Sequence, residues 1–318
     1  MKIVFNILFC YSFITLSAQE VHPTLEIKTS GAITDFFIEN SNIILSTDAG
    51  TIETYNVETG QQSDFVQMPT MKDFMGDEVP TKIYSIDKVL GRLLVITQGN
   101  HGFRNVSIFE NGQSSEIFNA ERDKLMIKKA RWINQNIILL GLMSNDLILY
   151  DVGQRKVICE LSISPYTFSD FSLTADKQFV FTADESGIVH KIKVGNCEIN
   201  QEFTGINVDN IYQVDSKNRV VITAGQDRRV GVYNTIINDN YFLQKDFLVY
   251  SVGLNKDGSI GAYSATEDNK ISIFNTTSQN ERCVLSGHES VVTKMAFFDD
   301  HTLISAGDDQ YLMIWKIE

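Results

Sequence analysis

A repeat of about 41 residues runs through this 318-residue chain and constrains its fold more than any other feature. In each copy a small or hydroxyl residue ends one strand-like run, a polar turn follows, and a second run ends in a large residue. The last copy reads SAGDDQYLMIWK (305–316) and the copy before it reads SATEDNKISIFN (264–275). The large end residues are Tyr55, Phe109, Tyr150, Ile192, Tyr233, Phe274 and Trp315, at successive spacings of 54, 41, 42, 41, 41 and 41.

A period near 41 residues with about four short strands in each unit is typical of a β-propeller blade. Runs rich in Val, Ile, Phe and Tyr alternate with Gly, Asn, Asp and Ser turns, without a long helical pattern. A single blade cannot bury both of its faces, so the blades must stack on one another. The sequence therefore predicts an all-β fold, with one seven-bladed propeller domain over residues 19–318.

The last unit, SGHESVVTKMAFFDDHTLISAGDDQYLMIWK (286–316), resembles a WD repeat. It contains the pair Gly287–His288, and it ends in Trp315–Lys316 where that family has Trp-Asp. The other six units lack these markers and match the family only in their period. The resemblance implies a WD-type propeller, a class of rigid platforms whose faces hold other proteins.

The same resemblance implies a buried hydrogen-bond chain in the last blade. We expect His288 to bond Asp309 and Ser305, and Ser305 to bond the indole N–H of Trp315, because a buried indole and a buried imidazole both need partners. The three residues His288, Asp309 and Ser305 also have the types of a hydrolase triad. No nucleophile-elbow glycine pattern surrounds Ser305, however, which favours the structural interpretation.

The seventh unit has only three strands before the chain stops at Glu318. Blades of the WD type have four strands, and an unpaired strand edge needs cover. The segment TLEIKT (24–29) precedes the first unit and has an alternating strand pattern. We expect it to be the outermost strand of the last blade.

The first 18 residues have the pattern of a secretory signal peptide: Lys2, an apolar run over 3–16, and small residues before Gln19. We expect export to the periplasm and no membrane anchor after cleavage, because no later stretch is long and apolar enough to span a bilayer. The net charge of −13 argues against nucleic acid as a partner.

Three cysteines, Cys159, Cys197 and Cys283, remain after the predicted cleavage. An odd, scattered set predicts buried thiols rather than a disulfide framework. Their spacing fits no zinc, haem or iron–sulfur site, so we expect no cofactor.

The longest interval between repeats contains an insertion, FVQMPTMKDFMGDEVPTK (65–82), rich in Met and Phe. Three interpretations stay open: a protein-docking surface, a Cu(I) site built from the thioethers of Met68, Met71 and Met75, or a plug over the ring. On a WD-type ring this loop and several turns open on the same face. The candidate partner-binding residues are Met68, Met71, Lys72, Asp73, Phe74, Met75, His101, Arg104, Arg228 and Arg229.

The chain contains no HExxH, GxSxG or P-loop motif, which favours a non-enzymatic interaction scaffold. The stretch KDFMGDEVPTKIYSID (72–87), with the signal peptide and the repeat plan, resembles the NapL family of accessory proteins of periplasmic nitrate reductase systems. This resemblance implies a role in assembly or activity of the reductase, with reductase components as protein partners. The alternatives are a Cu(I)-binding propeller and a propeller hydrolase.

Overall fold

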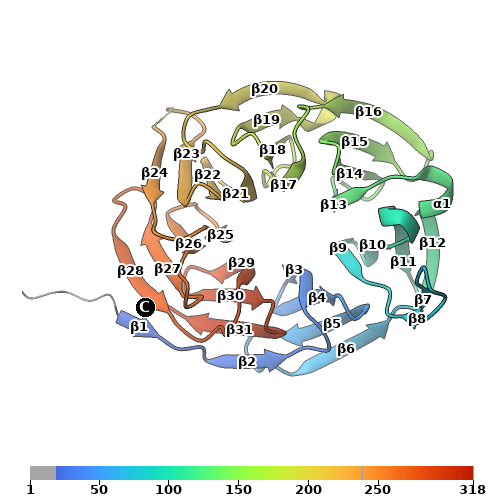
Figure 1. Cartoon of the computed structure of the whole chain (residues 1–318), viewed down its shortest axis with the longest axis horizontal. Coiled ribbons are helices and arrows are strands. Elements are labelled where there is room, and N and C mark those ends of the chain that lie inside the picture. The colour runs from blue at the N-terminus through green and yellow to red at the C-terminus, as the bar shows by residue number, and fades with distance from the viewer. Residues whose placement is uncertain (1–18, 238, 318) are drawn as a thin grey trace, which may run out of the picture.

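The computed structural model describes residues 19–237 and 239–317 and has the predicted seven-bladed propeller architecture (Figure 1). Seven antiparallel sheets surround a central channel, each with its first strand at the channel and its fourth at the rim. The predicted signal peptide, residues 1–18, lies outside the described residues. Within the described part, no helix has the length and apolar character needed to cross a bilayer.

The two inner layers of strands surround the channel. The innermost strands are β3 (Ile33–Glu39), β9 (Ile83–Val89), β13 (Ile127–Trp132), β17 (Phe168–Leu173), β21 (Ile211–Lys217), β25 (Ser251–Leu254) and β29 (Val292–Asp299). The second strands are β4 (Asn42–Thr47), β10 (Arg92–Gln98), β14 (Ile137–Leu142), β18 (Phe179–Asp184), β22 (Val220–Gly225), β26 (Ile260–Ser264) and β30 (Thr302–Gly307).

The two outer layers complete each blade. The third strands are β5 (Thr51–Asn56), β11 (Arg104–Glu110), β15 (Asp146–Asp151), β19 (Val189–Lys193), β23 (Arg229–Asn234), β27 (Ile271–Asn275) and β31 (Tyr311–Lys316). The outermost strands are β6 (Gln62–Gln67), β12 (Gln113–Phe118), β16 (Lys156–Ser162), β20 (Glu198–Phe203), β24 (Tyr241–Gln244), β28 (Glu281–Leu285) and β2 (Leu25–Lys28). All seven large residues that mark the repeat lie on third strands.

The apolar core lies between neighbouring blades. One cluster joins Leu94 and Ile108 of the second blade to Trp132 and Tyr150 of the third, and similar clusters fill other junctions. Each blade therefore depends on its neighbours for burial, as the period predicts.

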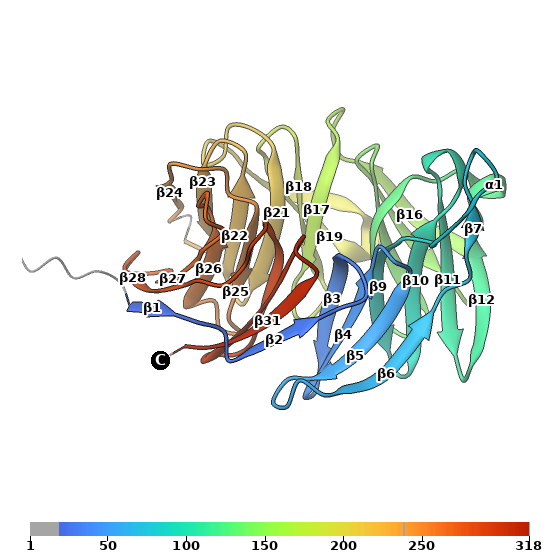
Figure 2. The ribbon, with the colours of Figure 1, turned by 60° about the horizontal axis from the view of Figure 1, so that its bottom comes forward.

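The N-terminal segment closes the ring as predicted. Strand β2 pairs antiparallel with β31, with Leu25 opposite Ile314, and extends the seventh blade to four strands (Figure 2). Outside the strand, the amide of Thr24 donates to the carbonyl of Ile314 at 2.8 Å, and that of Thr29 donates to Gln310 at 3.0 Å. The exposed edge of β31 is thereby covered.

A second closing strand was not predicted. Strand β1 (Gln19–Val21) pairs in parallel with β28 and adds a fifth strand to the sixth blade. An ion pair between Glu20 and Lys270, at 3.4 Å, lies beside it. The N-terminal segment thus joins the sixth and seventh blades before it enters the first.

The cysteine prediction is wrong for two of the three residues. Cys159 on β16 and Cys197, just before β20, form a disulfide across the junction of the third and fourth blades, with a Cα–Cα distance of 6.0 Å. The two positions are 38 residues apart, close to one repeat, so equivalent edges of adjacent blades bring them together. Cys283 is a buried free thiol, as expected.

Candidate functional site

The insertion folds as a small hairpin that stands off the ring between the first and second blades (Figure 1). Strands β7 (Met71–Lys72) and β8 (Glu78–Val79) pair antiparallel. One carboxylate oxygen of Asp73 accepts the amides of Met75 and Asp77, at 2.9 and 3.0 Å, and so fixes the connecting turn. This is an Asp-stabilised turn, which orders the tip without burying it.

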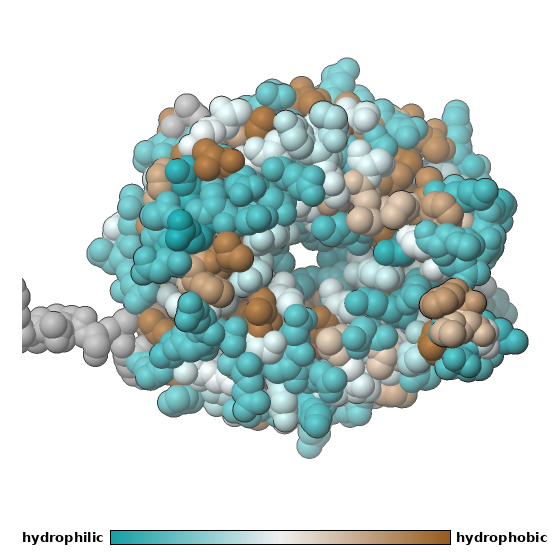
Figure 3. All heavy atoms as spheres, viewed as in Figure 1, coloured by the Kyte–Doolittle hydropathy of each residue, from teal (hydrophilic) through white to brown (hydrophobic). Residues whose placement is uncertain are grey.

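The hairpin tip presents apolar side chains to water. Phe74 is 97% exposed and Met75 is 74% exposed. Figure 3 shows a group of hydrophobic atoms over the β7–β8 hairpin, one of several such groups on this face. Exposed apolar groups of this kind on a soluble fold mark interaction surfaces.

A groove of about 560 Å³ separates the base of the hairpin from the second blade. Its walls include Met71 and Lys72 from the hairpin, residues 97–100 from the β10–β11 turn, and residues 119–121 around helix α1 (Ala120–Asp123). The insertion therefore lies beside the β10–β11 turn, and its tip is exposed rather than folded down as a plug over the first two blades.

Met68 is not part of the exposed surface, contrary to the prediction. It is buried in a cluster with Ile44, Ile83 and Val95, where it fills the space between the first two blades. Met68 and Met71 both line the groove, but Met75 is exposed at the hairpin tip and does not line it, so the three thioethers do not share one environment. The arrangement gives no support to the Cu(I) alternative.

His101 and Arg104 occupy the β10–β11 turn but do not line the groove. His101 is exposed within the 3-10 helix η1 (Asn100–Gly102). The Arg104 guanidinium stacks 3.8 Å from the ring centre of Tyr84 and donates to the carbonyl of Phe103. The Arg104 guanidinium therefore makes these contacts within its own blade.

Arg228 and Arg229, expected on the same face of the ring as the insertion, belong to a different blade. They lie at the β22–β23 turn of the fifth blade, on the far side of the channel from the hairpin (Figure 1). Arg229 stacks 4.1 Å from the ring centre of Phe242 and donates to the carbonyl of Ile206 at 2.8 Å. Only Arg228 of this pair is exposed.

The seventh blade contains the hydrogen-bond chain that the WD resemblance implies. His288 Nδ1 lies 2.8 Å from Asp309, His288 Nε2 lies 2.7 Å from Ser305 Oγ, and the Trp315 indole N–H donates to that same oxygen at 2.8 Å. Burial opposes ionisation of Asp309, but the hydrogen bond from His288 lowers the pKa of its carboxyl. Ser305 is fully buried, so its hydroxyl offers a substrate no access, unlike the nucleophile of a hydrolase triad.

The fifth blade has a second version of this chain that sequence reasoning missed. Asn207 replaces the histidine: its amide donates to Asp227 at 3.1 Å, and its oxygen accepts from Thr223 at 2.6 Å and from Tyr233 at 3.1 Å. The spacings from Asn207 to the other three residues are 16, 20 and 26, each one less than in the seventh blade. A search by spacing rather than by residue type would have found it.

The channel wall carries a ring of polar side chains, which we call the channel ring. Each blade contributes one member, which lies two residues after a buried apolar residue at or near the start of the inner strand. Its members are Asp35, Ser85, Lys129, Asp170, Gln213, Ser251 and Lys294. Each makes a hydrogen bond to the inner strand of an adjacent blade, so the ring links all seven blades.

Asp35 is the most heavily bonded member of the channel ring. Its carboxylate accepts from Lys294 of the seventh blade, and from Arg131 of the third blade at 3.0 and 3.1 Å. The amide of Ile86 donates to it at 3.0 Å. Although burial opposes ionisation, Arg131 and Lys294 hold the pKa of Asp35 well below its ordinary value.

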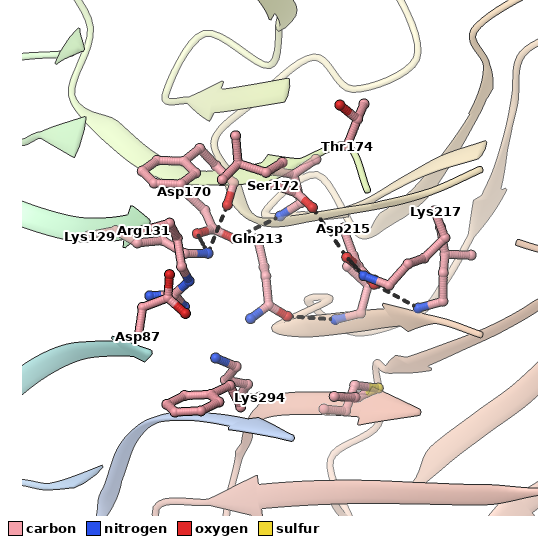
Figure 4. Close-up of a pocket in the computed structure, with 18 of the residues that line it drawn as sticks. Asp87, Lys129, Arg131, Asp170, Ser172, Thr174, Gln213, Asp215, Lys217 and Lys294 are labelled. Carbon is pink, nitrogen blue, oxygen red and sulfur yellow. Dashed lines mark hydrogen bonds and ion pairs between the residues drawn. The ribbon is translucent and has the colours of Figure 1, made fainter. Parts of the chain in front are cut away.

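A cavity of about 440 Å³ occupies the channel, with all seven inner strands contributing to its wall. Lys129, Arg131 and Asp87 lie on one side of it, Asp215 and Lys217 on the opposite side, and Lys294 on a third (Figure 4). Burial raises the pKa of Asp87. Trp132, the neighbour of Arg131, is fully buried and belongs to the core.

Comparisons with known proteins give a family match for the last blade and a structural match for the whole fold. A family model described as WD domain, G-beta repeat, matches residues 279–316. The chain is 25% identical over 195 residues to an uncharacterized WD repeat-containing protein of Schizosaccharomyces pombe, a match that covers 58% of this chain and 52% of that protein. The chain thus spans about half the length of the curated relative it matches.

The β-propeller domain of Cps50 (Swd1) from Myceliophteria thermophila is similar in structure, with a TM-score of 0.74. The alignment covers 93% of this chain and 99% of that domain, at 14% sequence identity. At this identity the likeness shows the fold alone. The protein is a seven-bladed β-propeller, and its match to the WD model is limited to residues 279–316.

Proposed function

We propose that this protein is a non-enzymatic periplasmic scaffold that holds another exported protein on the β7–β8 hairpin. The observation that carries the proposal is the exposure of Phe74 and Met75 at the hairpin tip. Aromatic and Met side chains are enriched at protein interfaces, where their burial supplies binding free energy. Because Asp73 already orders the turn, a partner would lose little conformational entropy in docking there.

Two features support export. The first 18 residues have the signal-peptide pattern, although they lie outside the described structure. The Cys159–Cys197 disulfide is of the kind that persists in oxidising compartments such as the periplasm.

We propose further that the partner is a component of a periplasmic nitrate reductase system. The support is the resemblance of residues 72–87 to the NapL family. That segment contains the exposed hairpin tip, so the stretch that carries the resemblance is also the one free to contact a partner. The role would be to assist assembly or activity of the reductase, without a metal centre of its own.

The two alternative functions have no observation in their favour. The copper site would need Met68, which is buried in the core. The hydrolase would need Ser305 as an accessible nucleophile, and it too is buried.

A pull-down from periplasm tests the proposal. The bait is the full chain with its signal peptide and a C-terminal tag, as wild type and as the double variant Phe74→Ser/Met75→Ser. The matched control is Ile237→Ser, which alters a side chain that is 68% exposed in the fifth blade. We expect mass spectrometry to find a reductase component with wild type and control, and a loss of at least about tenfold with the double variant.

The outcomes separate the two parts of the proposal. Recovery of a reductase component that is equal for all three baits would reject the hairpin as the docking site. Absence of any reductase component from the wild-type sample would reject the proposed partner.

A further inference from the structure

The cavity in the central channel is rich in cations, although the chain as a whole carries a net charge of −13. Its basic lining residues are Lys129, Arg131, Lys177, Lys217 and Lys294, and its carboxylates are Asp87, Asp170 and Asp215. A basic lumen in an acidic protein attracts small anions toward it, because the low-dielectric walls focus its field.

The three carboxylates are bonded to the wall of the channel. Each accepts a backbone N–H from the inner strand of the next blade. The donors are the amides of Trp132 to Asp87 at 2.6 Å, Val214 to Asp170 at 3.1 Å, and Leu254 to Asp215 at 3.0 Å. The other oxygen of Asp170 accepts from Lys129 at 2.7 Å, and the other oxygen of Asp215 accepts from Lys217 at 2.9 Å. Each of these two carboxylates therefore uses one oxygen for the channel wall and one for a lysine.

Three of the lysines keep unused hydrogen-bond donors. An ammonium group has three N–H bonds. Among the described residues, Lys294 bonds only Asp35, Lys217 bonds only Asp215 at 2.9 Å, and Lys177 bonds only the Trp132 carbonyl at 2.7 Å. Each therefore has two donors left at the wall of a cavity that acceptor groups could fill.

We infer that the central channel binds a small multivalent anion, an oxyanion or a polycarboxylate, between Lys294, Lys217 and Lys177. The volume of about 440 Å³ lies in the range of small-molecule sites. Ammonium groups act as point charges without the planar fork of arginine, so they suit anions of varied shape. The Arg131 fork is already held by Asp35, which leaves recognition to the lysines.

The electrostatics of Lys294 agree with this inference. Burial, together with the nearby charges of Arg131 and Lys129, lowers the pKa of Lys294 to about 8, and Asp35 only partly opposes them. An anion in the cavity would favour the charged form of Lys294 and so offset the repulsion among these cations.

Calorimetric titration of the full chain with citrate, and separately with sulfate, tests the inference. Ionic strength is held constant with sodium chloride, so that screening of surface charges does not change during the titration. We expect one saturable site per chain for at least one of the two anions. Lys217→Gln and Lys294→Met each weaken that binding by about tenfold or more, since each removes a charge-assisted bond.

Two controls guard the interpretation. Lys72→Gln removes an exposed lysine on the hairpin and leaves anion binding unchanged. Lys294→Met also removes a partner of Asp35, so Lys177→Gln is added as a variant that leaves the Asp35 pairs intact. Circular dichroism checks that each variant is folded. The inference is overturned if neither anion gives saturable heat, or if the folded channel variants bind as tightly as wild type.

The anion site is independent of the docking proposal. Phe74→Ser/Met75→Ser leaves anion binding at the wild-type level, because the hairpin stands at the rim and the cavity lies in the channel. A hairpin variant with wild-type anion affinity supports two separate sites, and one that loses anion binding contradicts this assignment.

Discussion

Lys294 in the last blade donates a hydrogen bond to the buried carboxylate of Asp35 in the first blade. This contact joins the two ends of the propeller on the channel side, whereas β2 joins them at the rim. Arg131 reaches the same carboxylate from the third blade and passes over the second. The amide of Ile86 in the second blade also donates to it, so one carboxylate connects four blades. The junction between first and last blades is closed on both of its sides.

Replacing Asp35 tests the importance of this contact. Asp35→Asn leaves Arg131 and Lys294 without their anionic partner, and breaking a buried pair in this way costs about 3–5 kcal/mol. We expect the free energy of unfolding at pH 7, measured in urea, to fall by this amount. The control Asp257→Asn, at a surface turn between β25 and β26, has little effect.

The same pair predicts how stability changes with pH. Arg131 and Lys294 hold the pKa of Asp35 below its unfolded value of about 3.9, despite the opposing effect of burial. The unfolded state therefore binds a proton at higher pH than the folded state, and the contribution of Asp35 is complete above about pH 4 and is lost as the pH falls further. The difference in unfolding midpoint between wild type and Asp35→Asn should therefore be smaller at pH 3 than at pH 7, with pH 4 between them. A constant difference across this range would contradict the assignment.

The buried hydroxyls of two equivalent positions predict opposite mutational effects. Ser305 bonds both His288 and Trp315, so Ser305→Ala leaves two buried groups without a partner and destabilises by about 1–3 kcal/mol. Thr182 occupies the equivalent position in the fourth blade, where Ile192 stands in place of the tryptophan. Its buried hydroxyl has no hydrogen-bond partner among the residues that the structure describes.

Thr182→Val should therefore leave stability unchanged or raise it, because the removed hydroxyl has only a desolvation cost in the folded state. Thermal unfolding of both variants beside wild type gives the comparison. A loss of stability with Thr182→Val similar to that of Ser305→Ala would show that the hydroxyl has a partner after all.

Removing the N-terminal strands tests the closure of the ring. A chain that lacks residues 19–28 loses the burial of Ile27 and exposes the edge of β31. We expect a melting temperature lower by about 5–10 °C and association through the free edge, seen as larger species in size-exclusion chromatography.

A shorter deletion, residues 19–21, removes only β1 and leaves β2 on β31. It should elute like the full chain and keep most of the thermal stability. If both truncated chains behave like wild type, the N-terminal segment does not close the ring.

The fold was predictable because the repeat is a property of the sequence alone. The large end residues from Tyr55 to Trp315 mark one strand in each blade. The last blade then has only three strands, and residues 24–29 have the strand pattern that completes it. The three residues of β1 are too few to show a strand pattern, so their parallel pairing was not predictable.

The site residues that escaped prediction depend on contacts between blades. Cys159 and Cys197 meet because a blade edge faces the next blade, which the cysteine count alone cannot reveal. The sequence does contain a signal for the channel ring, which was not used in the prediction. In every repeat a polar residue, such as Asp35 or Lys294, lies two positions after an apolar residue that is buried. The burial of Met68 and the exposure of Met75 differ although they share one loop, because the hairpin begins only after the chain leaves the core.

We propose that the β7–β8 hairpin docks an exported protein of the nitrate reductase system. Site-specific photo-crosslinking in the periplasm tests this contact at the hairpin itself. A photo-reactive phenylalanine analogue is placed at Phe74 in one full-length chain and at Ile237 in another. We expect a crosslink to a reductase component from position 74 and none from position 237. Equal crosslinking from both positions, or none to such a component from position 74, would contradict it.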